Sequence, residues 1–187
     1  MNLQEIMEEA RNQIEELENP ESIRTPGRTW TRYPDNIEET IESNSEIEPV
    51  IESSGDVEVF TGEKAINEAG EKAFNLIKKD ENRLNAIHAA NLNSVIYAKV
   101  SGEAELHITY DEERSVLSHL IIDAGSNSAL TVTEETNSGD FNTSFTEIYV
   151  GENASVDYGA IENAGVFSFS RRKAITEKYG VINWLNG

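Results

Sequence analysis

Three short stretches of this chain read SALTV (residues 128–132), ASVDY (residues 154–158) and GVINW (residues 180–184), and each begins 26 residues after the one before. Each stretch has a small residue first and apolar residues at its third and fifth positions. Aligning the stretches produces columns of like residues. One apolar column holds Leu130, Val156 and Ile182, the other holds Val132, Tyr158 and Trp184, and the polar column between them holds Thr131, Asp157 and Asn183.

The same spacing continues upstream of these stretches. Ile122, Ile148 and Ala174 are also 26 residues apart, as are Gly125 and Gly151. We expect the two glycines at turns that need a residue tolerant of positive φ. An earlier copy, AELHI (residues 104–108), precedes SALTV by 24 residues and predicts a slightly shorter turn of the same kind.

A repeat of this length built only from strands and turns is typical of a β-helix, in which each coil buries its inward face on its neighbours. Stacking places equivalent residues about 4.8 Å apart, so the columns predict continuous ladders through the interior. A leucine-rich repeat would need its Leu-x-Leu and Asn signature, which is missing. An antiparallel sandwich remains an alternative, because turn spacing alone would fit it. The predicted strands are SVIYAKV, AELHITY, LSHLIID, SALTVTEE, FTEIYV, ASVDYGAIE, VFSFSRRKAI and GVINW.

Three segments precede these strands. Residues 1–20 predict an amphipathic helix that Asn19 and Pro20 end, and its apolar stripe needs a partner surface on this chain or on another protein. Residues 21–60 predict an acidic extended linker, whose Trp30 and Tyr33 either anchor it to the body or form a docking motif. The stripe consists of Leu3, Ile6, Met7, Ala10, Ile14 and Leu17.

Residues 61–93 predict short helices, and residues 94–187 predict the β-helix coils, incomplete at the C-terminus. The first helix is expected over residues 62–79. The second is expected over residues 80–91, with Asp80 as its cap. The shared faces consist of Ile66, Ala69, Ala73, Phe74 and Ile77 in the first, and of Leu84, Ile87 and Asn91 in the second.

Composition excludes several kinds of function. A formal charge of -20 over 187 residues disfavours nucleic acid and anionic lipid as partners. It suits either a halophilic source or an ordinary acidic protein. The chain has no cysteine, which excludes disulfides and thiolate metal sites within it. Acids near the N-terminus do not fit a signal peptide, and no stretch of about 18 apolar residues occurs, so a cytoplasmic location is expected.

From about Trp30 to its C-terminus the chain resembles the SufB/SufD family, core components of the SUF iron-sulfur cluster assembly machinery. The resemblance rests on NSVIYAKVSG (residues 93–102), HLIIDAGSNSALTVTEE, TEIYVGENASVDYGAIEN and SRRKAITEKYGVINW, in this order and spacing. It implies a mainly β fold, a right-handed parallel β-helix of about 26 residues per coil after a small helical region. It also implies a non-catalytic scaffold that pairs with a SufB-type paralogue or with itself, and that binds a SufC-type ABC ATPase.

Departures from the family pattern favour the SufD-like, supporting type. Thr136 stands where the scaffold-type subunit has a cysteine, and Glu162, Asn163 and Ala164 stand where it has Gln-Asn-Trp, while a basic residue persists at Arg172. The family's cluster-interface cysteine and histidine, and its ATPase-contacting helices, lie beyond the matching part. We therefore expect no catalytic, cofactor-binding or metal residue in this chain. An iron-sulfur cluster is expected only in the assembled complex.

Two other classes of function stay open. A carbohydrate-active β-helix protein would use acids such as Glu134 and Glu135 or residues 111–113, but these are expected at solvated turns. A protein-interaction module would dock through its N-terminal helix. The three histidines, His88, His107 and His119, lack metal-ligand spacing and are expected at the surface or the edge of the core.

Overall fold

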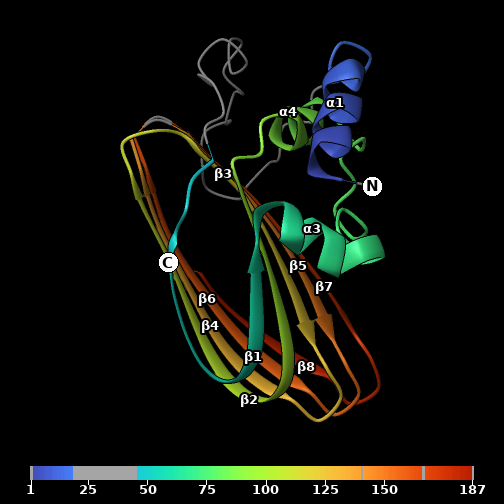
Figure 1. Cartoon of the computed structure of the whole chain (residues 1–187), viewed down its shortest axis with the longest axis vertical. Coiled ribbons are helices and arrows are strands. Elements are labelled where there is room, and N and C mark those ends of the chain that lie inside the picture. The colour runs from blue at the N-terminus through green and yellow to red at the C-terminus, as the bar shows by residue number, and fades with distance from the viewer. Residues whose placement is uncertain (1, 19–45, 140, 166, 187) are drawn as a thin grey trace, which may run out of the picture.

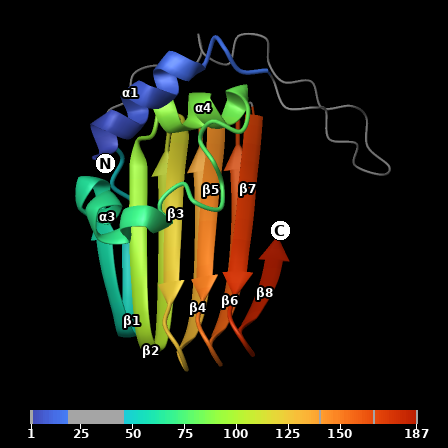
Figure 2. The same ribbon diagram turned by 90° about the vertical axis from the view of Figure 1, so that its right-hand side faces the viewer.

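The strands from β2 onward form a parallel β-helix with two walls. The computed structural model describes residues 2–18, 46–139, 141–165 and 167–186. One wall contains the first half of β2 with β3, β5 and β7, and the other contains its second half with β4, β6 and β8 (Figures 1 and 2). The strands are β2 Ser94–Glu112, β3 Val116–Ala124, β4 Ala129–Ser138, β5 Phe141–Val150, β6 Ser155–Ala164, β7 Phe167–Thr176 and β8 Val181–Asn186.

The observed register confirms the predicted columns. Leu130 pairs with Val156 and Val156 pairs with Ile182, in parallel, so residues 26 apart in the sequence lie side by side. The column of Ile122, Ile148 and Ala174 forms in the same way on the opposite wall. Because wall neighbours from β2 to β8 are parallel, the antiparallel sandwich is excluded.

The shorter step of 24 residues does not occur where AELHI predicts it, on the β2–β4 wall, but on the β2–β3 wall. Ala104 pairs with Leu130, a step of 26, whereas Ser94 pairs with Ser118, a step of 24. The cause is that β2 is one continuous strand that passes from wall to wall without the turn that later coils have. SVIYAKV and AELHITY, predicted as separate strands, are its two halves.

The expectation of positive φ at Gly125 and Gly151 is wrong. At these turns between the walls the left-handed residues are Asn127, Asn153 and Tyr179, with φ of 62°, 57° and 61°. Each is the third residue of a four-residue turn, such as the one closed by the Ser128 N–H donating to the Gly125 carbonyl at 3.2 Å. Gly151 instead allows close backbone packing, because a Cβ there would lie 2.7 Å from the Ser126 nitrogen.

Alternation along the strands divides each wall into an inner and an outer face. The inner faces of both walls meet in one apolar cluster that includes Leu106, Leu120, Val132, Ile148 and Val156. The outer face of the β3–β5–β7 wall is also buried, because a layer of helices covers it. The outer face of the β4–β6–β8 wall carries no such layer in the described part of the chain (Figure 1).

The N-terminal helix α1, Leu3–Gln13, docks on its own chain. Ile6 and Ala10 are completely buried in the cluster that also holds Ala86 and Ala90 of α4. Asn2 begins the helix with a capping box, in which its side chain accepts from Glu5 N at 2.8 Å. The helix ends six residues before Asn19, earlier than predicted, and the chain continues in turns to Leu17.

The region predicted to hold two helices is more broken than expected. Helix α3, Gly62–Ala69, stops at Gly70, whose φ is 56°, and a short 3-10 helix, Gly70–Lys72, follows. The predicted helix through Ile77 therefore does not form, because a left-handed glycine ends α3. Helix α4 is Arg83–Ala90, and its cap is Asn82, which accepts from Asn85 N at 3.0 Å, rather than Asp80.

Part of the predicted linker is a strand. Residues 19–45, with Trp30 and Tyr33, lie outside the described residues, but β1, Val50–Thr61, pairs antiparallel with β2 along almost its whole length. Val57 and Val59 alternate with acidic residues and pack on the interior cluster. The acidic residues made this strand alternation hard to recognise in the sequence. None of the helices in the described part of the chain has the length and apolar character needed to cross a bilayer.

Candidate functional site

Polar side chains fill one half of the β-helix interior, the half nearest the corner between β4 and β5. The inward residues of β4 run from apolar to polar, from Leu130 and Val132 to Glu134, Thr136 and Ser138. Both Glu134 and Thr136 are buried, with 2% and 0% exposed. Burial of so many polar groups requires partners for them inside the protein.

Tyr158 is the centre of the first group of contacts. Its hydroxyl donates to Glu134 Oε2 at 2.5 Å and lies 3.4 Å from Thr146 Oγ1. The Arg172 Nε donates to the same hydroxyl at 3.4 Å. Because β4, β5, β6 and β7 each supply one of these residues, the contacts join the two walls across the interior.

Glu162 is the centre of the second group. Its carboxylate accepts from Arg172 at 2.5 Å and from the Ser144 hydroxyl at 2.9 Å. The hydroxyls of Ser168 and Ser170 also donate to it, the former at 3.2 Å. The ion pair with Arg172 and the three serine hydroxyls together satisfy the hydrogen-bonding capacity of the Glu162 carboxylate, whose side chain is only 16% exposed.

Glu134 is the more deeply buried of the two carboxyl groups. Burial raises the pKa of Glu134, although the Tyr158 hydrogen bond and Arg172 act in the opposite direction. Burial and the charge of Glu134 also raise the pKa of the Tyr158 phenol. Arg172 forms its ion pair with Glu162, so these contacts join polar side chains to one another across the interior. With no cysteine in the sequence, sulfur chemistry on a protein thiol is excluded here.

The structure brings three of the family-matched positions together. Thr136 pairs with Glu162 in the ladder between β4 and β6, and Glu162 binds Arg172. Asn163 instead points to the outer face, where its amide donates to Asn137 Oδ1 at 3.0 Å. Ala164 is the inward neighbour of Ser138 in the same ladder.

The expectation that Glu134 is a solvated turn residue is wrong. Strand alternation continues through residues 130–138, so Glu134 has the same inward direction as Leu130, and only Glu135 is exposed. This alternation was readable in TVTEETNS, but the two adjacent acids suggested a turn. The role of the Tyr158 hydroxyl and of the three serines was also missed, because a tyrosine in an apolar column gave no sign of its polar contacts.

A second buried polar cluster lies between the helices and the β3–β5–β7 wall. His119 Nε2 lies 2.9 Å from Glu147 Oε2, and His88 Nδ1 lies 2.8 Å from Thr143 Oγ1. Burial, together with the nearby His119, places the pKa of His88 well below its usual value. Both histidines belong to the core rather than to its edge, whereas His107 is exposed on the other wall.

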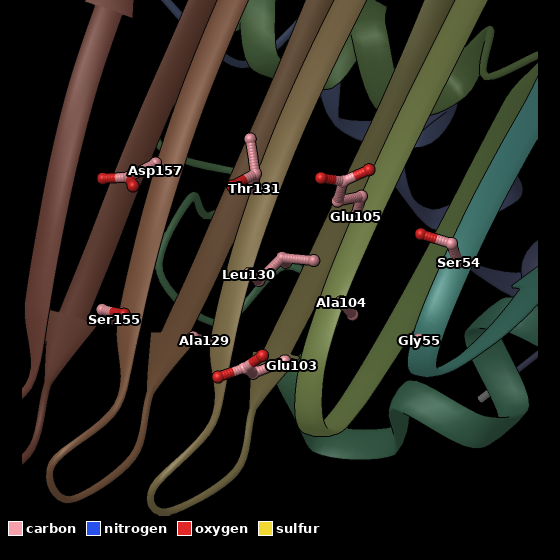
Figure 3. Close-up of a pocket in the computed structure, with 10 residues that line it drawn as sticks. All are labelled: Ser54, Gly55, Glu103, Ala104, Glu105, Ala129, Leu130, Thr131, Ser155 and Asp157. Carbon is pink, nitrogen blue, oxygen red and sulfur yellow. The ribbon is translucent and has the colours of Figure 1, made fainter.

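A hollow of about 410 Å³ lies on the outer face of the β4–β6–β8 wall (Figure 3). Figure 3 shows Glu105, Thr131 and Asp157 side by side on three neighbouring strands, with the two carboxylates separated by the threonine. Carboxylates two strands apart do not converge on one ion. Within the described ranges, no group of three or more His, Cys, Asp or Glu residues is arranged to hold a metal ion.

Two comparisons with known proteins found sequence similarity to this chain. Residues 107–187 match the family described as SUF system FeS cluster assembly, SufBD core domain. The iron-sulfur cluster assembly protein SufD of Bacillus subtilis (strain 168) is 29% identical over an alignment of 148 residues, and the match covers 70% of this chain and 34% of that protein. The chain therefore matches about a third of the length of this relative.

Proposed function

The chain belongs to the SufB/SufD family, and we propose that it is a non-catalytic, SufD-like scaffold component of iron-sulfur cluster assembly. In this role it pairs with a SufB-type subunit and works with a SufC-type ABC ATPase in the cytoplasm. The iron-sulfur cluster is the cargo of the assembled complex. None of its ligands comes from a thiolate of this chain, since the sequence has no cysteine.

The pairing of Thr136 with Glu162 is the observation that carries the SufD-like assignment. At the position matched to the scaffold-type cysteine, the interior holds a threonine whose side chain is fully buried. Its neighbour Glu162 is already bound to Arg172 and to serine hydroxyls. These contacts support a structural role, because they bind the two walls together.

Copurification tests the proposed partners. The 187-residue chain is expressed with an affinity tag beside the SufB-type and SufC-type proteins of its source, at the salt concentration of that source. A stoichiometric complex with the SufB-type subunit supports the proposal. A folded chain that binds neither protein contradicts it.

The carbohydrate-active alternative makes a different prediction with the same material. It requires calcium to bind the acids around the hollow in Figure 3, and it requires an acidic polysaccharide to bind the purified chain. Titration calorimetry with calcium, then with polygalacturonate, measures both. Saturable binding of either would favour this alternative over the scaffold role.

A further inference from the structure

Three buried side chains at the corner between β4 and β5 have polar atoms without a protein partner. These atoms are Thr136 Oγ1, Ser138 Oγ and both amide atoms of Asn142. The exposed fractions of the three residues are 0%, 8% and 0%. A buried amide or hydroxyl that makes no hydrogen bond is costly, so several such atoms in one place indicate a bound partner.

The three side chains share one part of the interior. Ser138 and Asn142 flank the corner, and Thr136 is the next inward residue on β4. In the following coil the ladder neighbour of Thr136 is Glu162, whose carboxylate is bound by Arg172 and Ser144, whereas the other two neighbours are small. Ala164 lies beside Ser138, and Ser168 lies beside Asn142. Packed walls stand about 10 Å apart, and side chains this short do not span such a distance.

Solvent reaches the same corner from outside. A hollow of about 660 Å³ lies there, and its lining includes both Ser138 and Ala164, as well as Gly139 and Gly165. Two glycines at adjacent turns leave the corner without side-chain cover at these positions. The inward residues therefore lie close to bulk water, although their own side chains are buried.

The chemistry of the corner favours a neutral occupant. Two hydroxyls and an amide supply both donors and acceptors but no charge. The nearest inward cation, Arg172, is engaged by Glu162, so an anion at the corner would lack a counter-charge. A metal cation would need several oxygens around it, and no such group of acids exists in the described part of the chain.

We propose that the corner between β4 and β5 is a binding site for ordered water, held by Thr136, Ser138 and Asn142. A buried water makes about three hydrogen bonds, which matches the number of side chains available. The water satisfies the orphan atoms and continues the hydrogen bonding of the polar half of the interior. This inference does not depend on the proposed function.

Replacing Thr136 by valine tests the proposal, because a hydrated and a dry corner predict opposite results. If water binds there, Thr136→Val removes one of its partners, and the unfolding equilibrium constant rises about five- to tenfold. If the corner is dry, the substitution removes an orphan hydroxyl and the constant stays the same or falls. Thr133→Val is the matched control, since it makes the same change on β4 at a half-exposed outward position.

A second measurement does not depend on a variant. In the full 187-residue chain, nuclear Overhauser transfer from long-lived water to the side-chain amide protons of Asn142 is expected, and this transfer should weaken in Thr136→Val. The absence of such transfer in the unsubstituted protein would overturn the proposal. So would a Thr136→Val variant at least as stable as Thr133→Val.

Discussion

Glu147 and His119 face each other in the buried layer between the helices and the β-helix, with 2.9 Å between Oε2 and Nε2 and neither side chain exposed. The same carboxylate accepts from the backbone N–H groups of Phe74 and Ile77 at 2.7 and 2.8 Å, and from that of Leu76. It therefore holds the irregular segment after α3, where Phe74 has a φ of 56°. This explains how the segment is ordered after α3 has ended early.

Glu147→Gln should therefore destabilise the protein by about 2–4 kcal/mol, because an amide cannot accept from all of these donors at once. Urea unfolding measures the change, and hydrogen exchange of the Leu76 and Ile77 amides should become faster. Glu152→Gln is the control, since that side chain is exposed at a turn. Equal stability of the two variants would contradict the role given to Glu147.

The repeat in the sequence predicted the β-helix, because ladder stacking imposes the same constraint on every coil. Leu130, Val156 and Ile182 must all fill the interior, so their spacing is visible in the sequence. The left-handed turn position was not found, although Asn127 and Asn153 are also 26 residues apart. Glycine is the commonest signal for positive φ, but asparagine also tolerates this conformation.

The candidate site was less predictable than the fold. Its members come from four strands, and their contacts depend on how the two walls face each other. The interval between Tyr158 and Glu134, 24 residues, matches no ladder step on their wall, so the repeat does not show this contact. Similarly, no local pattern links Glu147 to the segment about 70 residues earlier that it holds.

The stability of the protein should fall below pH 6.5 because of His88. Burial lowers its pKa in the folded state, so the unfolded chain binds a proton there that the folded chain does not. Each pH unit below 6.5 should then cost about 1.4 kcal/mol until the folded pKa is reached. Urea unfolding at pH 7 and pH 5 should show a smaller difference for His88→Gln than for the unsubstituted protein.

His107→Gln is the control for this experiment, because His107 is exposed and the variant should keep the full pH dependence. The quantity compared is the difference between the free energies of unfolding at pH 7 and pH 5 within each protein. A loss of stability in His88→Gln that is the same at both pH values therefore does not affect it. If both variants retain the same dependence, His88 is not the responsible group.

The carboxyl group of Glu134 should act in the opposite sense. Because its folded pKa is raised, the folded state keeps a proton that the unfolded state loses, and the stabilisation present below pH 4.5 is lost as the pH rises through the folded value. Glu134→Gln cannot ionise and still accepts from Tyr158. We expect this variant to be about 1 kcal/mol more stable than the unsubstituted protein at pH 8, with the advantage vanishing near pH 4.

Glu135→Gln provides the matched control, since Glu135 is the exposed neighbour on the same strand. Thermal unfolding from pH 4 to pH 8 measures both variants. An advantage of Glu134→Gln that does not grow with pH would show that ionisation of this carboxyl does not cause the loss of stability at high pH.

Tyr179 occupies the left-handed turn position that the two preceding coils fill with asparagine. Its φ is 61° and its side chain is 70% exposed, so little contact offsets the backbone cost apart from Lys178, whose ammonium lies 4.8 Å from the ring centre. Asparagine tolerates this conformation better than tyrosine. At the preceding position, Asn153 also donates to Asn127 Oδ1 at 3.3 Å, and an asparagine at 179 would extend this ladder.

Tyr179→Asn should stabilise the protein by about 0.5–1 kcal/mol in urea unfolding. Tyr179→Ala removes the ring but keeps the backbone cost, so it should give no gain. If alanine stabilises as much as asparagine, the effect comes from removing an exposed aromatic ring and not from the turn.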